Sequence, residues 1–191
     1  QGVFETNGSG VLARTLGAGI YQTDKVIATQ SLSMGIQRSG NFERLLFEVV
    51  GRDAARVRAM MGALAQSGRF EMQEKELALT RALFAAARVD EDATIEVMRD
   101  FEAAHGFQID PHSAVGIGAA ARAVLPDNVP MVTLATAHPA KFPKAVMAAY
   151  DAAPDTPQRV LDMLEKEERL TPIANELVAV ENAIREKARL V

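Results

Sequence analysis

The chain has 191 residues, of which 48% are hydrophobic and 24% charged, so it can bury a sizeable core and is not of the disordered or collagenous class. Its formal net charge is −4 and its Lys and Arg residues are spread through the predicted helices, so no basic stripe for a nucleic-acid partner is expected. The absence of cysteine excludes disulfides, thiolate zinc sites and a cysteine nucleophile. We expect a reducing compartment, the cytoplasm.

No apolar run approaches the roughly 20 residues that span a bilayer, and the first six residues carry neither a basic nor an apolar targeting segment. We therefore expect no membrane partner. The first residue is Gln1 rather than Met, which indicates a processed, trimmed or partial chain.

The chain opens with a predicted turn at residues 6–10 (TNGSG), followed by a short helix that Gly17 and Gly19 close. Residues 26–29 form a β-branched and apolar run of strand length, and residues 30–40 after it are polar and contain glycine. A loop that follows a strand is a common ligand site in α/β proteins.

Two amphipathic helices follow, the first capped by Asn41 and the second ending near Gly68. Their apolar side chains recur every three or four positions, which predicts one buried face on each helix and packing of the two as neighbours. These side chains are Phe42, Leu45, Leu46 and Val49, then Val57, Met60, Met61 and Leu64.

Three further helices are predicted, over residues 73–87, 91–106 and 110–125, the last of them rich in small residues. Residues 130–136 (PMVTLAT) are the strongest strand candidate, and they run directly into the loop 137–143. The order strand, loop, helix is typical of an α/β fold.

The tail predicts two helix starts, because Thr156 precedes Pro157 and Thr171 precedes Pro172. The apolar side chains of the last helix recur every three or four residues, so we expect that face to dock and the opposite face to meet water. They are Ile173, Leu177, Val180, Ile184 and Ala188. The predicted organisation is an α/β part over residues 1–153 and a helical tail over residues 154–191.

Two apparent ligand motifs favour structural roles instead. Gly116, Gly118 and Ala121 match the spacing G-x-G-x-x-A, but no convincing strand precedes them and no acidic residue is placed to hold a ribose, which favours close helix packing. Asp110 before Pro111 most simply caps a helix, rather than taking part in catalysis.

The titratable candidates are scattered. His105, His112 and His138 have no metal-ligand spacing, so we predict no metal site. Lys141 follows the predicted strand, where an amine can form a Schiff base, although lysines in such loops more often meet solvent or phosphate.

Ser31, Ser33 and Ser39 share a glycine-containing loop that can present hydroxyl and N–H groups to an anion, with a plain surface loop as the alternative. The residues alone therefore indicate two candidate loops, 30–40 and 136–143, on an α/β scaffold.

Four segments stand in the order found in one enzyme family: TNGSGVLARTL, TQSLSMGIQRSGNFERLLFEVVGRD, DPHSAVG and TLATAHPAKFP. Over nearly its whole length the chain resembles the C-terminal part of threonine synthase, a fold-type II pyridoxal-phosphate enzyme. The resemblance implies an α/β fold, namely the helix-rich C-terminal portion of the large domain with a helical C-terminal tail.

The resemblance also implies the chemistry. Threonine synthases are lyases of threonine biosynthesis that convert O-phosphohomoserine and water to threonine and phosphate, with pyridoxal phosphate as the electron sink. The family's motif puts Thr136 by the cofactor's ring nitrogen, where a neutral hydroxyl would leave that nitrogen largely unprotonated. The resemblance puts further residues in the vicinity of substrate or cofactor: Asn7, Ser31, Ser33, His138 and Lys141.

The chain departs from the family pattern at five positions near the ligand: Ser9, Gly10, Leu32, Gly35 and Gly40. Loss of an aspartate to glycine removes a charge and loosens the backbone. The resemblance places the Schiff-base lysine and the glycine-rich phosphate loop upstream of this chain, so we expect no catalytic residue within it.

Three hypotheses follow. The chain is the C-terminal portion of a threonine synthase, or a catalytically inactive relative that acts by binding, or a standalone α/β domain that binds a small anion through residues 30–40. The first two predict exposed apolar groups and self-association.

Overall fold

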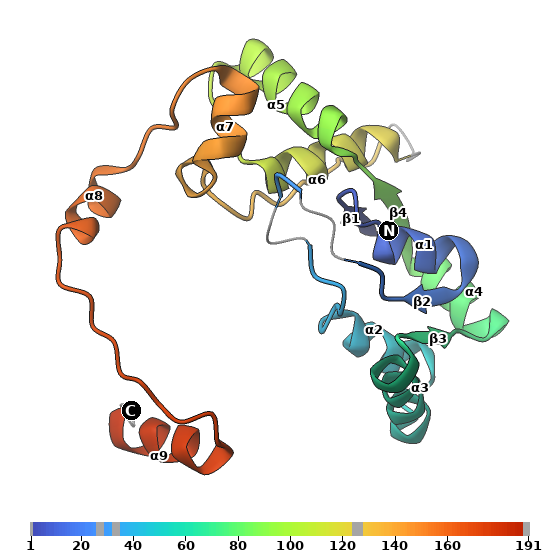
Figure 1. Cartoon of the computed structure of the whole chain (residues 1–191). Coiled ribbons are helices and arrows are strands. Elements are labelled where there is room, and N and C mark those ends of the chain that lie inside the picture. The colour runs from blue at the N-terminus through green and yellow to red at the C-terminus, as the bar shows by residue number, and fades with distance from the viewer. Residues whose placement is uncertain (1, 26–28, 32–34, 124–127, 189–191) are drawn as a thin grey trace. The chain divides into compact units, whose positions relative to one another are not determined.

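A computed structural model describes residues 2–25, 29–31, 35–123 and 128–188. The chain forms two compact units, residues 1–155 and residues 156–191 (Figure 1). No helix among the described residues is long and apolar enough to cross a membrane.

The centre of the first unit is a parallel pair of strands, β1 (Gly2–Thr6) and β4 (Phe84–Arg88). Alternate residues of a strand point to opposite faces. On one face Val3 packs with the cluster of α6 (Pro111–Arg122), and on the other face Phe4 packs with the cluster that contains α1 (Val11–Ala18). The two helices therefore cover opposite faces of the pair.

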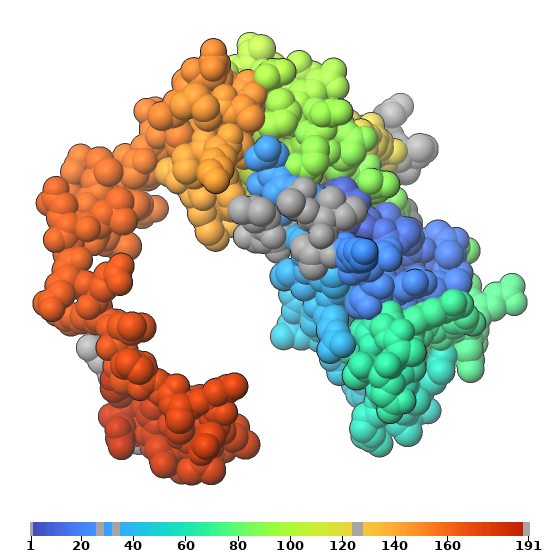
Figure 2. Space-filling view, viewed as in Figure 1, coloured from blue at the N-terminus to red at the C-terminus, as the bar shows by residue number. Residues whose placement is uncertain are grey.

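The largest apolar cluster joins α1 to a second, antiparallel strand pair and three helices. The strands are β2 (Ile20–Gln22) and β3 (Arg69–Glu71), and the helices are α2 (Phe42–Val49), α3 (Ala54–Ser67) and α4 (Glu74–Leu83). Tyr21 lies opposite Phe70, and their rings stack with centroids 5.0 Å apart. The predicted packing of α2 beside α3 is confirmed, as the space-filling view also shows (Figure 2).

A separate cluster forms between α5 (Glu91–His105), α6 and α7 (Pro143–Tyr150), with Met98 and Val146 fully buried in it. Arg99 fixes α7 to α5 by donating hydrogen bonds to the carbonyls of Ala148 and Ala149 at its carboxyl end. These two helices thus form one packed layer with α6.

Most predicted helix boundaries are confirmed by the caps. Gly19, Gly68 and Gly106 adopt the left-handed conformation after α1, α3 and α5, which favours glycine because it has no Cβ. The Asp110 carboxylate caps α6 as predicted. Asn41 stands at the N-cap position of α2, but its side chain makes no capping hydrogen bond.

Two predictions for the first unit were wrong. The helix predicted over 73–87 ends at Leu83, because the next five residues pair with β1 as a strand despite their alanine-rich composition. Residues 130–136 are not a strand; they have no pairing partner among the described residues. The strand predicted over 26–29 lies outside the described residues except for Thr29, which is not in a strand.

The second unit contains α8 (Gln158–Leu164) and α9 (Leu177–Lys187). The first begins at Gln158, one residue after the predicted start, so that Pro157 takes the N-cap position predicted for Thr156. The helix start predicted at Thr171 was wrong, because α9 begins only at Leu177, and the Thr171 hydroxyl instead accepts a 2.6 Å hydrogen bond from the Lys187 amine. None of the described residues of this unit is buried, so the predicted docking of the apolar face of α9 is not seen.

Candidate functional site

The candidate site lies where β1 ends. After Thr6 the chain turns tightly, with the Gly10 N–H donating to the Asn7 carbonyl at 3.0 Å, and α1 begins at Val11. Gly10 has a φ of 60°, a conformation that costs a residue with a Cβ, so this departure from the family pattern suits the local backbone. The N-terminus of α1 has no side-chain cap and no acidic residue in its first turn.

The Asn7 side chain holds two loops together. Its amide nitrogen donates to the hydroxyls of Thr29 (2.9 Å) and Ser31 (3.0 Å), and its amide oxygen accepts from the Ser9 N–H (3.1 Å) and hydroxyl (2.8 Å). All four residues are buried. Two of the predicted site residues, Asn7 and Ser31, are therefore in direct contact, and their polar atoms position the loops.

The loop 29–31 continues this network toward α5. The Gln30 N–H donates to one carboxylate oxygen of Glu91, and the other oxygen is buried without a hydrogen-bond partner among the described residues. Both residues line a cavity of about 570 Å³, with Lys141 and Phe142 among its other walls. No sequence pattern singled out Glu91 as a site residue. Acidic residues are common in the first turn of a helix, where they interact favourably with the helix dipole, so its presence there needed no further explanation.

The predicted residues of the TAHPAKF segment lie on a short turn before α7. His138 accepts a hydrogen bond from the Ala140 N–H at 3.2 Å, which starts the 3₁₀ helix η2 (Pro139–Lys141). The Lys141 amine lies 5.7 Å from the centroid of the Phe142 ring, in a cation–π arrangement. Thr136, His138 and Lys141 are all exposed. Ser33 lies outside the described residues.

Phe142 links this turn to the DPHS segment, because its ring centroid lies 4.4 Å from that of His112. The Asp110 carboxylate accepts from the backbone N–H groups of His112 (2.9 Å) and Ser113 (3.4 Å) and from the Ser113 hydroxyl, and it lies 3.1 Å from His112 Nδ1. Burial raises the pKa of Asp110, but these hydrogen bonds outweigh it and hold the pKa below its usual value.

Glu5 is a second acidic residue that the sequence did not single out. It lies on β1, half-buried, where burial raises its pKa and the nearby His112 opposes that rise. A charged residue is unexpected in β1, because this strand lies between two packed helices. A glutamate within a largely apolar strand is the sequence signal that could have identified it. Glu5 lines cavities on both faces of β1.

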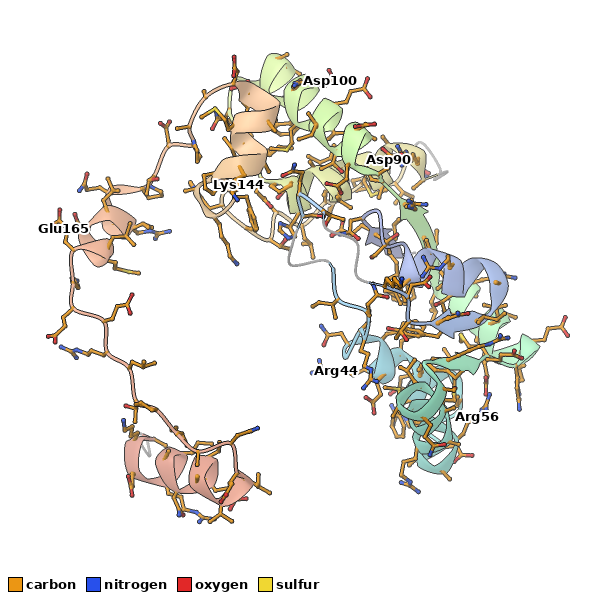
Figure 3. The ribbon with its side chains drawn as sticks, viewed as in Figure 1. Arg44, Arg56, Asp90, Asp100, Lys144 and Glu165 are labelled. Atoms are coloured by element: carbon orange, nitrogen blue, oxygen red, sulfur yellow. The ribbon has the colours of Figure 1, made fainter. Side chains whose placement is uncertain are left out.

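The cavity on the α1 face measures about 600 Å³ and is lined by Asn7, Ser9 and Ser39 together with the side chains of Arg38 and Arg44. Both arginines are exposed, and Figure 3 shows Arg44 projecting from α2. The rest of the lining is largely apolar, with Phe4, Leu12 and Phe42 among its residues, and it includes the Glu5 carboxylate. The two arginines are therefore the groups at this cavity that suit an anionic ligand.

The chain is similar to known threonine synthases over most of its length. Residues 113–184 match the family model described as "Threonine synthase, C-terminal". The chain is 37% identical to the threonine synthase of Pseudomonas aeruginosa over 182 residues, which cover 95% of the chain and 39% of that protein. It is 34% identical to the Saccharomyces cerevisiae threonine synthase over 158 residues, covering 74% of the chain and 31% of that protein.

Solved structures of threonine synthases are also similar to this chain. The structure of a pyridoxal-phosphate-bound threonine synthase from Brucella melitensis matches with a TM-score of 0.83 and 44% identity, over 98% of this chain and 40% of that one. The yeast threonine synthase matches with a TM-score of 0.77 and 30% identity, over 96% and 41%. The chain thus spans well under half the length of the relatives that it matches. It has their helix-rich α/β fold, belongs to the threonine synthase family and corresponds to its C-terminal part.

Proposed function

We propose that this chain is the C-terminal portion of an active threonine synthase, which converts O-phosphohomoserine and water to threonine and phosphate. One observation carries the proposal: segments far apart in the sequence converge at the carboxyl end of β1. Asn7 is hydrogen-bonded to Ser31, and Phe142 contacts His112. The crevice beyond the carboxyl ends of parallel strands is the usual ligand site in open α/β sheets.

We propose that Thr136 lies on one side of pyridoxal phosphate, as the family resemblance implies. Thr136 is exposed and neutral, so its hydroxyl is available to the ring nitrogen and would not stabilise a proton there as a carboxylate would. When bound, the cofactor supplies an electron sink for the substrate's carbon centre. Lys141 is not assigned a covalent role, because its amine lies over the Phe142 ring. We infer that Asn7 and Ser31 act by positioning the loops, and that His138 shapes the turn that carries Thr136.

The two arginines at the cavity beside Asn7 support this choice of substrate. O-phosphohomoserine carries a phosphate and a carboxylate, and guanidinium groups bind both kinds of anion in bidentate geometry. We propose that Arg38 and Arg44 attract the substrate into the 600 Å³ cavity beside Asn7.

We further propose that residues 1–153 contribute to the large α/β domain and residues 154–191 form its helical tail. A cytoplasmic location rests on the absence of cysteine. Self-association of the isolated chain stays a prediction.

A chimera tests this function. The part of the Pseudomonas aeruginosa enzyme that precedes its matched region is joined to this chain, and phosphate release from O-phosphohomoserine is measured with added pyridoxal phosphate. We expect turnover, and we expect Thr136→Val to reduce it while Thr171→Val, at an exposed threonine of the tail, leaves it unchanged. A chimera that folds and binds the cofactor but releases no phosphate would contradict the proposal and favour a catalytically inactive binding module.

A further inference from the structure

The hydroxyl of Tyr21 holds the backbone on both sides of Arg38. It donates a hydrogen bond to the Gln37 carbonyl at 3.0 Å and accepts one from the Ser39 N–H at 2.8 Å. A phenolic hydroxyl can donate and accept at the same time, so one oxygen satisfies both backbone groups. The two neighbours of Arg38 are therefore attached to a side chain of β2.

The packing of the Tyr21 ring does not explain this hydroxyl. Tyr21 is 1% exposed, and its ring stacks on Phe70 at 5.0 Å and lies 5.8 Å from Phe42, both measured between ring centroids. A phenylalanine would make the same apolar contacts, whereas a buried tyrosine needs a partner for its polar end. Both partners of the hydroxyl lie in the segment 37–39, so the hydroxyl serves this segment rather than the apolar cluster.

The segment 37–39 is also attached on either side of this contact. The Gln37 side-chain oxygen accepts from the Asp24 N–H at 2.9 Å, just after β2. The Ser39 carbonyl accepts from the Phe42 N–H at 3.0 Å, where the chain enters α2 (Figure 1). The Tyr21 hydroxyl lies between these two attachments and fixes the residues that they leave in the middle.

Arg38 is the side chain that this segment presents to the cavity of about 600 Å³ beside Asn7. Arg38 is exposed, and no hydrogen bond or ion pair holds its guanidinium group among the residues that the structure describes. The other arginine of the cavity, Arg44, is carried by α2, and the helix fixes its backbone. The direction of Arg38 depends instead on the backbone of a short segment that Tyr21 holds.

We propose that Tyr21 is a positioning residue for anion binding, because its hydroxyl holds the segment 37–39 so that the Arg38 guanidinium points to a phosphate group in the cavity. The inference rests on the proposed function, in which Arg38 attracts the substrate. An arginine whose backbone is fixed before binding loses less conformational freedom when it meets its anion. Without the hydroxyl, the Gln37 carbonyl and Ser39 N–H lose their shared partner and the segment gains conformations that direct Arg38 elsewhere.

The chain offers a matched control for removal of this hydroxyl. Tyr21→Phe removes one oxygen and keeps the ring, so the apolar cluster stays packed. Tyr150→Phe removes a hydroxyl with the same kind of role, because that group donates to the Ile109 carbonyl at 3.2 Å and accepts from the Ile109 N–H at 3.1 Å. Neither Tyr150 nor Ile109 lines the cavity that contains Arg38.

Binding of inorganic phosphate to the whole chain, measured by titration calorimetry, tests the role of Tyr21. We expect Arg38→Gln to weaken binding roughly tenfold and Tyr21→Phe roughly threefold to tenfold, with Tyr150→Phe unchanged. The double variant Tyr21→Phe/Arg38→Gln should bind no more weakly than Arg38→Gln alone, because the hydroxyl acts through Arg38. A hydroxyl that only stabilised the fold would weaken both backgrounds by the same factor.

Hydrogen exchange tests the contact itself without any ligand. Tyr21→Phe should speed exchange of the Ser39 amide, whose N–H loses its acceptor, and leave the Ile109 amide unchanged. Tyr150→Phe should have the opposite pattern. In a chimera that turns over, Tyr21→Phe should raise KM for O-phosphohomoserine by the factor found for phosphate and leave kcat unchanged, whereas partial unfolding would lower kcat.

The outcomes separate this inference from the proposed function. Unchanged Ser39 exchange in Tyr21→Phe would overturn the inference, as would faster exchange with unchanged phosphate binding. If the parent chain does not bind phosphate, or if Arg38→Gln does not weaken binding, both the role of Tyr21 and the anion site are overturned. If Tyr21→Phe weakens phosphate binding but the chimera releases no phosphate, the role of Tyr21 stands and only the proposed activity is contradicted.

Discussion

Residues 1–155 and residues 156–191 carry similar helix patterns, but their apolar side chains have different surroundings. In the first unit the periodic faces of α2, α3, α5 and α6 meet one another and form three buried clusters. In the second unit α9 also has a periodic apolar face, yet none of the described residues there is buried. Leu164 and Leu177, for example, are both exposed.

The difference shows that helix formation and burial are predicted by different features of a sequence. Spacing of three and four residues predicts a helix and names the face that would be buried, but burial requires a second surface. The first unit supplies its own surfaces. The second unit does not, so its interactions are short-range hydrogen bonds and ion pairs at the surface. Matched substitutions in the two units should therefore have unequal effects.

The largest contrast is expected for a leucine. Leu46→Ala in α2 removes a side chain that is 1% exposed, and we expect it to lower the free energy of unfolding by about 2–5 kcal/mol. The matched change Leu164→Ala removes a side chain that is 75% exposed, and we expect a change within about 0.5 kcal/mol. Denaturant unfolding of both variants measures this. Equal losses would show that the tail is buried in solution.

Ion pairs should follow the same order. The Arg56 guanidinium donates hydrogen bonds of 2.9 and 3.0 Å to the buried Glu76 carboxylate and holds the pKa of Glu76 below its usual value. We expect Glu76→Gln to cost about 1.5–3 kcal/mol at neutral pH. Glu181→Gln breaks the exposed pair with Arg185 in α9 and should cost no more than about 0.5 kcal/mol.

The pH dependence of the Glu76 effect has a definite sign. A carboxyl whose folded pKa is lowered contributes stability above its unfolded pKa, near 4.5, and loses that contribution as pH falls through the folded value. The stability difference between the parent chain and Glu76→Gln should therefore narrow below about pH 4.5. Denaturant melts at several acidic pH values test this, and a constant difference would rule out a role for the charge.

The buried amide gives the next contrast. Asn7→Ala leaves the Thr29 and Ser31 hydroxyls and the Ser9 N–H without their partner, for which we expect a loss of about 1–3 kcal/mol. Asn182→Ala affects only an exposed contact with Arg185 and should have little effect. Hydrogen exchange of the loops 7–10 and 29–31 should rise in the first variant only.

The smallest effect on stability is expected for Leu177→Lys, because the Leu177 side chain is exposed. The change should reduce self-association, if the exposed apolar residues of the tail drive it. Sedimentation velocity across a range of concentrations measures both quantities on one sample set. Unchanged association would place the contact in the first unit.

Local sequence signals predicted the helices well and the strands poorly. Caps such as Gly19, Gly68 and Asp110 depend on a few neighbouring residues, so the sequence locates them. The alanine-rich composition of β4 predicts a helix. These residues form a strand because they pair with β1, which is far away in the chain. Residues 130–136 show the converse, a strand pattern without a partner.

The candidate site divides in the same way. Asn7 and Thr136 came from the family resemblance, and Ser31 came both from its loop and from the resemblance, but no pattern showed that Asn7 and Ser31 are in contact. Glu5 and Glu91 gave weak signals, since their roles depend on burial that the chain acquires only on folding. Arg38 and Arg44 have the ordinary appearance of solvent-exposed side chains until the cavity between them is known.

The glycines of α6 have a consequence for mutational tolerance. A Cβ at Gly116 would collide with the Glu5 carboxylate and Thr133, and a Cβ at Gly118 would lie 3.2 Å from Val89, whereas one at Gly62 in α3 would meet open space. In a saturation library both α6 positions should be depleted of large side chains, and position 62 should not. An alignment built from the survivors would be enriched in small residues at the two positions of the G-x-G and suggest a nucleotide-binding motif, although the selection acts on interhelical and helix–sheet distance.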